Sequence, residues 1–242
     1  RMRVGIHQIN YLPWMGYFNK IAKSDVFILM DEVQMTDGGM MQRNRVLNKN
    51  GEISFLTVAF EKKGYMDIPF SEVRLNQAVD WQKRQLNFLW DNYHKFPYWE
   101  EVYKSFAFVF EEKFETLQQV NERTIRQIML LLDIQTPLIY QSSLSYDRTT
   151  KNNDLVLELC KAVGADCYLS GNGAKKYMEV EAFRQQGINV QFQTFDSPTY
   201  AQKYARGEAV IGLSILDAFL NCGVEETRQL FWKSICNNEV NA

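Results

Sequence analysis

Three polar side chains stand near the start of the chain, where a buried strand is expected to end. His7, Gln8 and Asn10 directly follow the apolar run Val4–Ile6, and such a run of β-branched residues is typical of a strand inside a sheet. An imidazole can exchange a proton near neutral pH, and amide side chains can orient a hydrogen-bonding substrate. The pattern therefore predicts a site here, with His7 as a candidate catalytic base.

A turn and a short helix follow this cluster and would present it to a ligand. Pro13 stiffens the turn, Gly16 permits close approach of the backbone, and the helix is expected to end near Ser24. In one interpretation the polar and aromatic residues here contact a ligand. In the other, the aromatic residues are core and the amides only cap the turn. The candidate substrate-binding residues are Gln8, Asn10, Tyr11, Trp14, Gly16 and Tyr17.

A second apolar run, Asp25–Met30, predicts another buried strand that ends in polar residues. Asp31 and Gln34 follow it; Asp31 is a candidate general base and Gln34 a candidate binding residue. A strand, a helix and a second strand form a βαβ unit with a right-handed crossover. Ligands of open α/β sheets bind outside the carboxyl ends of the strands, so both polar clusters stand where a ligand is expected.

The segment 42–60 is predicted to form a β-hairpin. Asn50-Gly51 is a strong turn signal between two strand-like stretches. The hairpin is locally basic, and guanidinium groups suit phosphate and carboxylate. Arg43 and Lys49 are therefore candidate contacts for an anionic ligand, whereas a solvated β face is the alternative and suits Arg45 better.

Residues 80–133 are predicted to form a helical insertion. Apolar residues recur there at spacings of three and four, with Asp80 as a candidate N-cap. We assign the aromatic residues of this region to the core. His94 follows the first apolar stripe; a lone histidine at a helix end most often caps or packs, and contact with a ligand is the alternative.

The α/β rhythm returns between Pro137 and Phe195, which favours a parallel sheet covered by helices. Small residues lie between an expected strand and a helix expected to begin near Ala174. Free backbone N–H groups at a helix N-terminus suit phosphate or carboxylate, although the turn could simply be glycine-rich with solvated lysines. The candidate binding residues are Ser170, Gly171, Asn172 and Lys175.

A helix predicted over Leu213–Cys222 has one polar face. Ser214, Asp217 and Asn221 are spaced three and four residues apart, so they share that face. Such a stripe can face water or join a site. Asp217 is the second candidate general base, in competition with Asp31, and Tyr200 in the preceding turn is a candidate binding residue.

Four stretches of the chain form long and specific motifs. They are HQINYLPWMGYFNKIAKSDVFILMDEVQ at 7–34, YLSGNGAKKYM at Tyr168–Met178, the turn Phe195–Tyr200, and LSILDAFLNCG at Leu213–Gly223. These stretches resemble the WbqC-like family, whose members are bacterial proteins often encoded among genes for O-antigen and other surface polysaccharides. The resemblance implies transfer of a glycyl or other acyl group onto a sugar, as in lipopolysaccharide assembly. It favours ligand contacts for Arg43, Asn44 and Lys49, and a role for Ser214, Asp217 and Asn221.

Composition excludes several classes of protein. The 242 residues are 46% apolar and 14% aromatic, which indicates a packed globular protein, and the net charge of −2 gives no general attraction to nucleic acid. No apolar run approaches the roughly 18 residues that span a bilayer, so we expect a cytoplasmic protein.

Two histidines and four cysteines without CxxC spacing make a metal site unexpected. A homo-oligomer is possible, because the aromatic residues around Tyr93–Tyr103 could form a dimer face.

The sequence thus predicts a single α/β domain over 1–242, with a doubly wound, mainly parallel sheet that resembles nucleotidylyltransferase-like folds. The leading hypothesis is a transferase that moves an aminoacyl or acyl group onto a nucleotide-linked or lipid-linked amino sugar. The alternatives are an ATP-dependent amide ligase and a non-catalytic sugar-nucleotide-binding protein. Adenylyl-transferring enzymes carry HxGH where this chain has Trp14-Met15-Gly16-Tyr17, which counts against adenylation. The cofactor stays open between ATP and a nucleotide-linked sugar.

Overall fold

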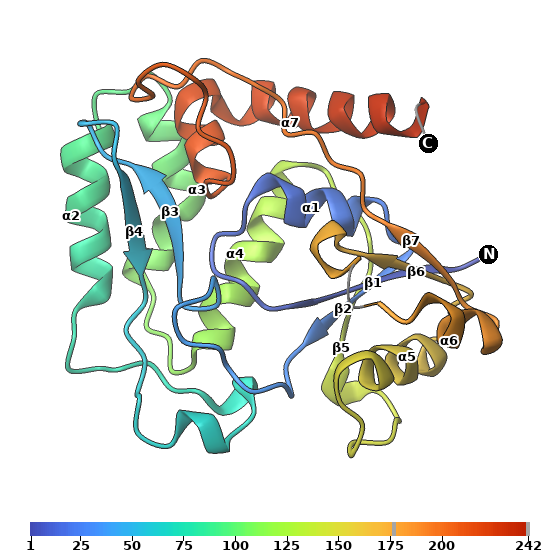
Figure 1. The fold of residues 1–242 in the computed structure, drawn as a ribbon. Coiled ribbons are helices and arrows are strands. Elements are labelled where there is room, and N and C mark those ends of the chain that lie inside the picture. The colour runs from blue at the N-terminus through green and yellow to red at the C-terminus, as the bar shows by residue number, and fades with distance from the viewer. Residues whose placement is uncertain (176–177, 241–242) are drawn as a thin grey trace.

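The fold is an α/β sheet with a separate hairpin and a group of helices beside it (Figure 1). The computed structural model of the protein describes residues 1–175 and 178–240. The strands are β1 (Arg3–Gln8), β2 (Val26–Met30), β3 (Arg43–Leu47), β4 (Ile53–Thr57), β5 (Leu138–Tyr140), β6 (Cys167–Ser170) and β7 (Asn189–Phe192). The helices are α1 (Met15–Ala22), α2 (Trp81–Tyr93), α3 (Trp99–Glu111), α4 (Leu117–Leu131), α5 (Asn152–Ala162), α6 (Val180–Gln185) and α7 (Leu216–Val240).

Five parallel strands form the main sheet, in the order β5-β2-β1-β6-β7. The chain therefore moves outward from β1 in one direction through β2 and β5, and in the other direction through β6 and β7. The point where the order reverses lies between β1 and β6, and ligands of such sheets bind outside the carboxyl ends of the strands at this point. The parallel sheet predicted from the sequence is confirmed.

The register brings two predicted polar segments together at that point. Gly5 of β1 pairs with Leu169 of β6. When this parallel register is continued by two residues, His7 lies level with Gly171. On the other side, His7 pairs with Leu29 of β2. The carboxyl ends of β1 and β6 thus present His7 and the Gly171 turn at the same edge.

Helices cover both faces of the sheet. Because side chains alternate along a strand, successive residues of one strand pack into different cores. Phe27 and Leu29 of β2 belong to a large core with α1, α3, α4 and the start of α7. Val26 and Ile28 belong to a smaller core with α5 and α6. Figure 1 shows α1 on one side of the sheet and α5 and α6 on the other.

The predicted hairpin is present: β3 and β4 pair antiparallel, and Gly51 at the turn has a φ of +79°. The predicted helical segment is also present, but it is interrupted between α3 and α4. Thr116 begins α4 with a capping box, in which its side chain accepts from the Gln119 N–H. Such a cap starts a new helix, although the apolar spacing continues across it.

Two other helices differ from their predicted bounds. The helix expected from Ala174 begins at Val180, and Asn172–Ala174 form only one 3-10 turn. The C-terminal helix begins at Leu216 and runs past a break at Gly223, whose φ is +83° and where a Cβ would meet the Tyr98 ring at 2.7 Å. In the part of the chain that the structure describes, no helix is long and apolar enough to cross a membrane.

Candidate functional site

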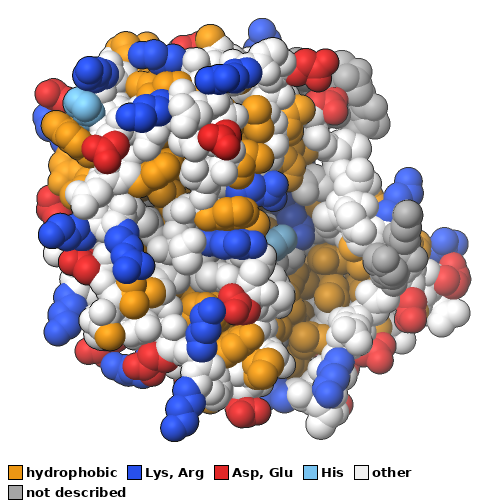
Figure 2. Space-filling view, turned by 60° about the vertical axis from the view of Figure 1, so that its left-hand side comes forward, with side chains coloured by type: hydrophobic (Ala, Val, Ile, Leu, Met, Phe, Trp, Pro, Cys, Tyr) orange, Lys and Arg blue, Asp and Glu red, His pale blue; other side chains and the backbone are white. Residues whose placement is uncertain are grey.

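A cavity of about 330 Å³ lies at the carboxyl ends of β1 and β6. The hollow on the face drawn in Figure 2 has Lys or Arg and His side chains at its edge and hydrophobic side chains inside. The size falls within the range of small-molecule sites. The lining residues of the cavity are His7, Trp14, Gly16, Tyr17, Lys20, Gly171, Asn172, Gly173, Gln193 and Phe195.

His7 is held with one ring nitrogen available. Its Nδ1 lies 3.0 Å from the Gln8 carbonyl oxygen, and because a carbonyl can only accept, Nδ1 carries the hydrogen and Nε2 the lone pair. The same oxygen accepts from the Tyr17 hydroxyl at 2.7 Å, and the Tyr17 ring packs on the imidazole with centroids 4.8 Å apart. Burial, and secondarily the charge of Lys20, lower the pKa of His7 to about 4. His7 is therefore neutral at pH 7.

Lys20 places a buried positive charge beside His7. Its side chain is only 5% exposed, and Nζ donates to the Ile6 carbonyl at 2.7 Å. No carboxylate of the described residues forms an ion pair with it. An ammonium has three donors, so the Ile6 contact leaves two unused. Burial lowers the pKa of Lys20 to about 8, and an anion in the cavity would offset that burial.

The turn after β6 leaves space in front of its backbone. Gly171 has an ordinary φ of −63°, and a Cβ built on Gly171 or Gly173 would meet no atom within 4 Å. Neither a left-handed backbone nor close packing explains these glycines. Open space at a cavity wall lets a ligand approach the backbone closely.

An aromatic pair and one glutamine complete the cavity. The rings of Trp14 and Phe195 meet edge to face at 5.4 Å, and Trp14 is 37% exposed. Gly16 permits this position of Trp14, because a Cβ there would lie 2.2 Å from the indole. Gln193 Nε2 donates to the Gly16 carbonyl at 2.8 Å and to Asn19 Oδ1 at 2.9 Å, which ties the start of α1 to the end of β7.

Gln8, Asn10 and Gln34 lie at or near the ends of β1 and β2. Gln8 and Asn10 are half-buried, Gln34 is exposed, and the side chains of all three make no hydrogen bond to a described residue. The backbone carbonyl of Gln8 is the group that orders the cavity. The structure thus places Gln8 beside His7, and its side-chain amide makes no hydrogen bond to a described residue.

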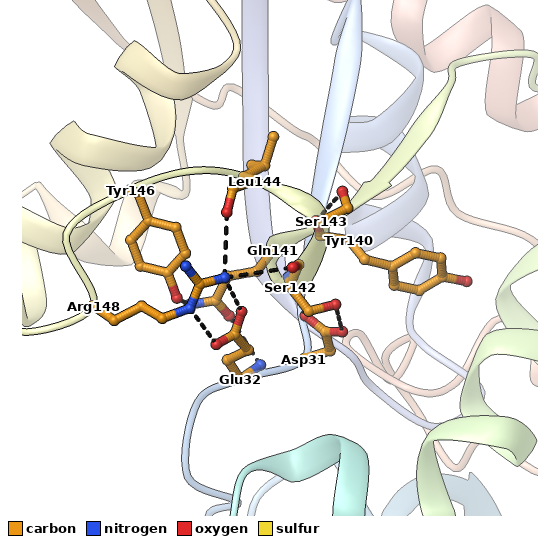
Figure 3. A network of polar contacts seen from close by, with 9 residues as sticks. All are labelled: Asp31, Glu32, Tyr140, Gln141, Ser142, Ser143, Leu144, Tyr146 and Arg148. Atoms are coloured by element: carbon orange, nitrogen blue, oxygen red, sulfur yellow. Dashed lines mark hydrogen bonds and ion pairs between the residues drawn. The ribbon is translucent and has the colours of Figure 1, made fainter.

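Asp31 anchors a loop at the neighbouring strand end and is not among the cavity lining (Figure 3). Its Oδ1 accepts from the Ser142 N–H at 2.9 Å and its Oδ2 from the Ser142 hydroxyl at 2.5 Å. Next to it, Arg148 forms a two-bond ion pair with Glu32. Both Asp31 oxygens are therefore occupied by bonds that hold the segment after β5.

Asp217 is the centre of a second buried polar group, also outside the cavity lining. Its carboxylate accepts from the Tyr200 hydroxyl at 2.6 Å, from Gln202 Nε2 at 3.0 Å and from Asn221 Nδ2 at 3.3 Å. Burial raises the pKa of Asp217, and these hydrogen bonds oppose the rise. The Ser214 hydroxyl accepts from the Leu216 N–H at the start of α7. These predicted site residues hold the loop before α7 in place.

The remaining predicted residues are not among the lining residues of the cavity. Tyr11 and Asn44 are buried, and Asn44 Nδ2 donates to the Tyr11 carbonyl at 2.9 Å. His94 stacks on Trp90. Lys49 is exposed at the hairpin turn. Ser170, which is buried, ends β6 beneath the Gly171 turn, whereas Lys175 is exposed beside Phe192.

Lys20 and Gln193 line the cavity but were not predicted from the sequence. Lys20 lies one helical turn after Gly16 and Tyr17, so it shares their face of α1, and that spacing was the available signal. Gln193 directly follows β7, at the same edge of the sheet as His7. Among residues 1–175 and 178–240, no group of three or more His, Cys, Asp or Glu side chains could hold a metal ion.

Comparison with known proteins gives two matches of high coverage. A family model described as the WbqC-like protein family matches residues 8–229. An uncharacterised protein of Mycobacterium tuberculosis is 31% identical over 225 residues, which cover 92% of this chain and 95% of that protein. No solved structure matches the chain.

Proposed function

The chain belongs to the WbqC-like protein family, as its motifs predicted, and we propose that it is a transferase whose phosphate-bearing substrate binds in the His7–Lys20 cavity. The proposal rests on Lys20, a buried cation that lines the cavity and has no carboxylate partner among the described residues. A buried charge without compensation is unfavourable. A phosphate group would supply the missing negative charge.

The cavity offers a partner for each part of a nucleotide-linked or lipid-linked sugar. The Lys20 ammonium and the open backbone of Gly171–Gly173 would hold phosphate oxygens. The Trp14 and Phe195 rings supply an apolar wall against which a base or sugar ring can stack. The position at the strand-order reversal is the one at which such sheets bind ligands.

His7 is the proposed general base for the transfer. An acceptor amine or hydroxyl would lose its proton to His7 Nε2 as it attacks the acyl carbonyl and the donor's leaving group departs. A pKa of about 4 makes the empty-site imidazole a weak base. Because part of that lowering comes from the Lys20 charge, a bound phosphate would screen it and raise the basicity of His7 when substrate is present.

The family resemblance suggests the identity of the transferred group, and the cavity itself does not indicate it. We propose an aminoacyl or other acyl group moved onto an amino sugar during bacterial surface-polysaccharide assembly. The test is to incubate the protein with uridine or thymidine diphosphate amino sugars and coenzyme A thioesters, and separately with ATP and amino acids, and to identify products by mass spectrometry.

His7→Gln and His94→Gln form a matched pair of variants for that assay. We expect His7→Gln to lower kcat by about a hundredfold or more with binding kept, and His94→Gln, whose ring lies on Trp90 outside the cavity, to behave as wild type. Release of AMP and pyrophosphate would replace the transferase with an amide ligase. Tight binding without any product would replace it with a binding protein.

A further inference from the structure

The outer face of the β3–β4 hairpin carries two guanidinium groups. Asn44 and Val46 of β3 point into the core, so the alternate residues Arg43 and Arg45 share the opposite face. Phe55 pairs with Arg45 across the hairpin and is 42% exposed on that face. Two cations and one aromatic ring thus form a compact surface group, which we call the arginine pair.

Neither arginine has a carboxylate partner among the described residues. Arg43 donates from Nη2 to the Gly38 carbonyl at 2.7 Å, and its guanidinium carbon lies 3.9 Å from the centre of the Phe55 ring. The Arg45 side chain makes no hydrogen bond to a described residue. The Nε atoms of both are buried without an acceptor. Buried N–H groups are nearly always paired in folded proteins.

We propose that the arginine pair is an oxyanion-binding site that accepts a phosphate or carboxylate group between Arg43 and Arg45. Guanidinium groups donate two parallel hydrogen bonds to such anions. One anion that accepts from the terminal Nη groups of both side chains would balance two like charges on neighbouring side chains of one strand face. Stacking on Phe55 fixes the Arg43 plane in advance.

The arginine pair is separate from the cavity but close to it along the backbone. The Ser214 N–H donates to the Arg45 carbonyl at 2.8 Å, and Ser214 forms a β-bridge with Trp14, which lines the cavity. Two strand spacings separate Trp14 from Arg45, which is roughly 10 Å. If the proposed function holds, the anion is the acidic end of a second substrate; the anion site itself does not depend on that activity.

The test uses a background in which the cavity cation is removed. In Lys20→Met, isothermal titration calorimetry with inorganic pyrophosphate and with malonate reports binding outside the cavity. We expect one of these anions to bind, and its identity distinguishes a phosphate from a carboxylate ligand. Adding Arg45→Met should raise Kd about tenfold or more, equivalent to about 1.4 kcal/mol, whereas adding Arg74→Met, on an exposed arginine elsewhere, should leave Kd unchanged.

Arg45→Lys in the same background guards against misfolding, because it keeps the charge but loses the planar fork. It should also weaken binding while the circular dichroism spectrum stays that of the parent. Absence of binding by both anions in Lys20→Met, or equal binding with and without Arg45, would overturn the site. Failure of the transferase proposal would instead appear as equal anion affinity of wild type and Lys20→Met.

Discussion

Replacing Lys20 with methionine should make the protein more stable while it removes anion binding in the His7–Lys20 cavity. Burial lowers the pKa of Lys20 from 10.5 to about 8, and at about 1.4 kcal/mol per pKa unit this corresponds to a cost of about 3 kcal/mol for the charged form below pH 8. Methionine keeps most of the buried stem but loses the hydrogen bond to the Ile6 carbonyl, a loss of about 1 kcal/mol. The net gain is therefore about 2 kcal/mol near neutral pH.

Thermal denaturation at two pH values measures this gain. For a chain of this length, about 2 kcal/mol corresponds to a rise in Tm of about 4–8 °C. The folded pKa of Lys20 lies below its unfolded value, so wild type gains stability as pH rises from about 8 to about 10.5. The advantage of Lys20→Met should consequently shrink over that interval.

Lys104→Met is the matched control, since Lys104 is exposed on α3. The same chemical change there should alter stability by less than about 0.5 kcal/mol. A lower Tm for Lys20→Met than for wild type at pH 6.5, or an advantage that does not change with pH, would refute the reasoning that a buried, uncompensated charge is kept for a ligand.

Three further predictions follow from other contacts. Gly16→Ala should displace the Trp14 ring, which a Cβ would meet at 2.2 Å. Tryptophan emission should then shift to the red, and ligand affinity should fall with little change in Tm. Unchanged emission would contradict this expectation. Asp31→Asn should lower the free energy of unfolding by about 2 kcal/mol, because it weakens the hydrogen bonds from Ser142 to the carboxylate. The Kd for pyrophosphate should stay unchanged. A loss of binding without a loss of stability would instead place Asp31 in the site. Burial raises the pKa of Asp217 above its ordinary value, so the Tm of Asp217→Asn should rise relative to wild type as pH rises above about 4. A difference that does not change with pH would contradict the buried charge.

The sequence predicted those parts of the fold that depend on neighbouring residues. Asn50-Gly51 defined the hairpin, and the apolar runs before His7 and Asp31 defined β1 and β2. The break between α3 and α4 was not foreseen, because the Thr116 cap competes with an apolar pattern that runs on through it. The helix expected from Ala174 was wrong at its start, so a phosphate at this turn would contact the open backbone of the glycines and not a helix N-terminus.

Partners from distant parts of the chain decided the rest of the site. Asp31 and Asp217 are indistinguishable as candidate bases in the sequence, and their occupation by Ser142 and Tyr200 is visible only after folding. Lys20 was not among the predicted site residues, because its burial and its lack of a carboxylate partner among the described residues are tertiary properties. Local patterns thus located the edge of the sheet that carries the cavity but not the charge within it.

The most direct test of the central claim is the affinity of wild type, Lys20→Met and Lys104→Met for uridine diphosphate, measured by isothermal titration calorimetry at pH 7 and pH 9. We expect wild type and Lys104→Met to bind alike and Lys20→Met to bind about tenfold or more weakly. Only wild type and Lys104→Met, which keep Lys20, should lose affinity as pH rises past about 8. Equal affinity of all three proteins at both pH values would contradict the claim that the His7–Lys20 cavity is a phosphate site.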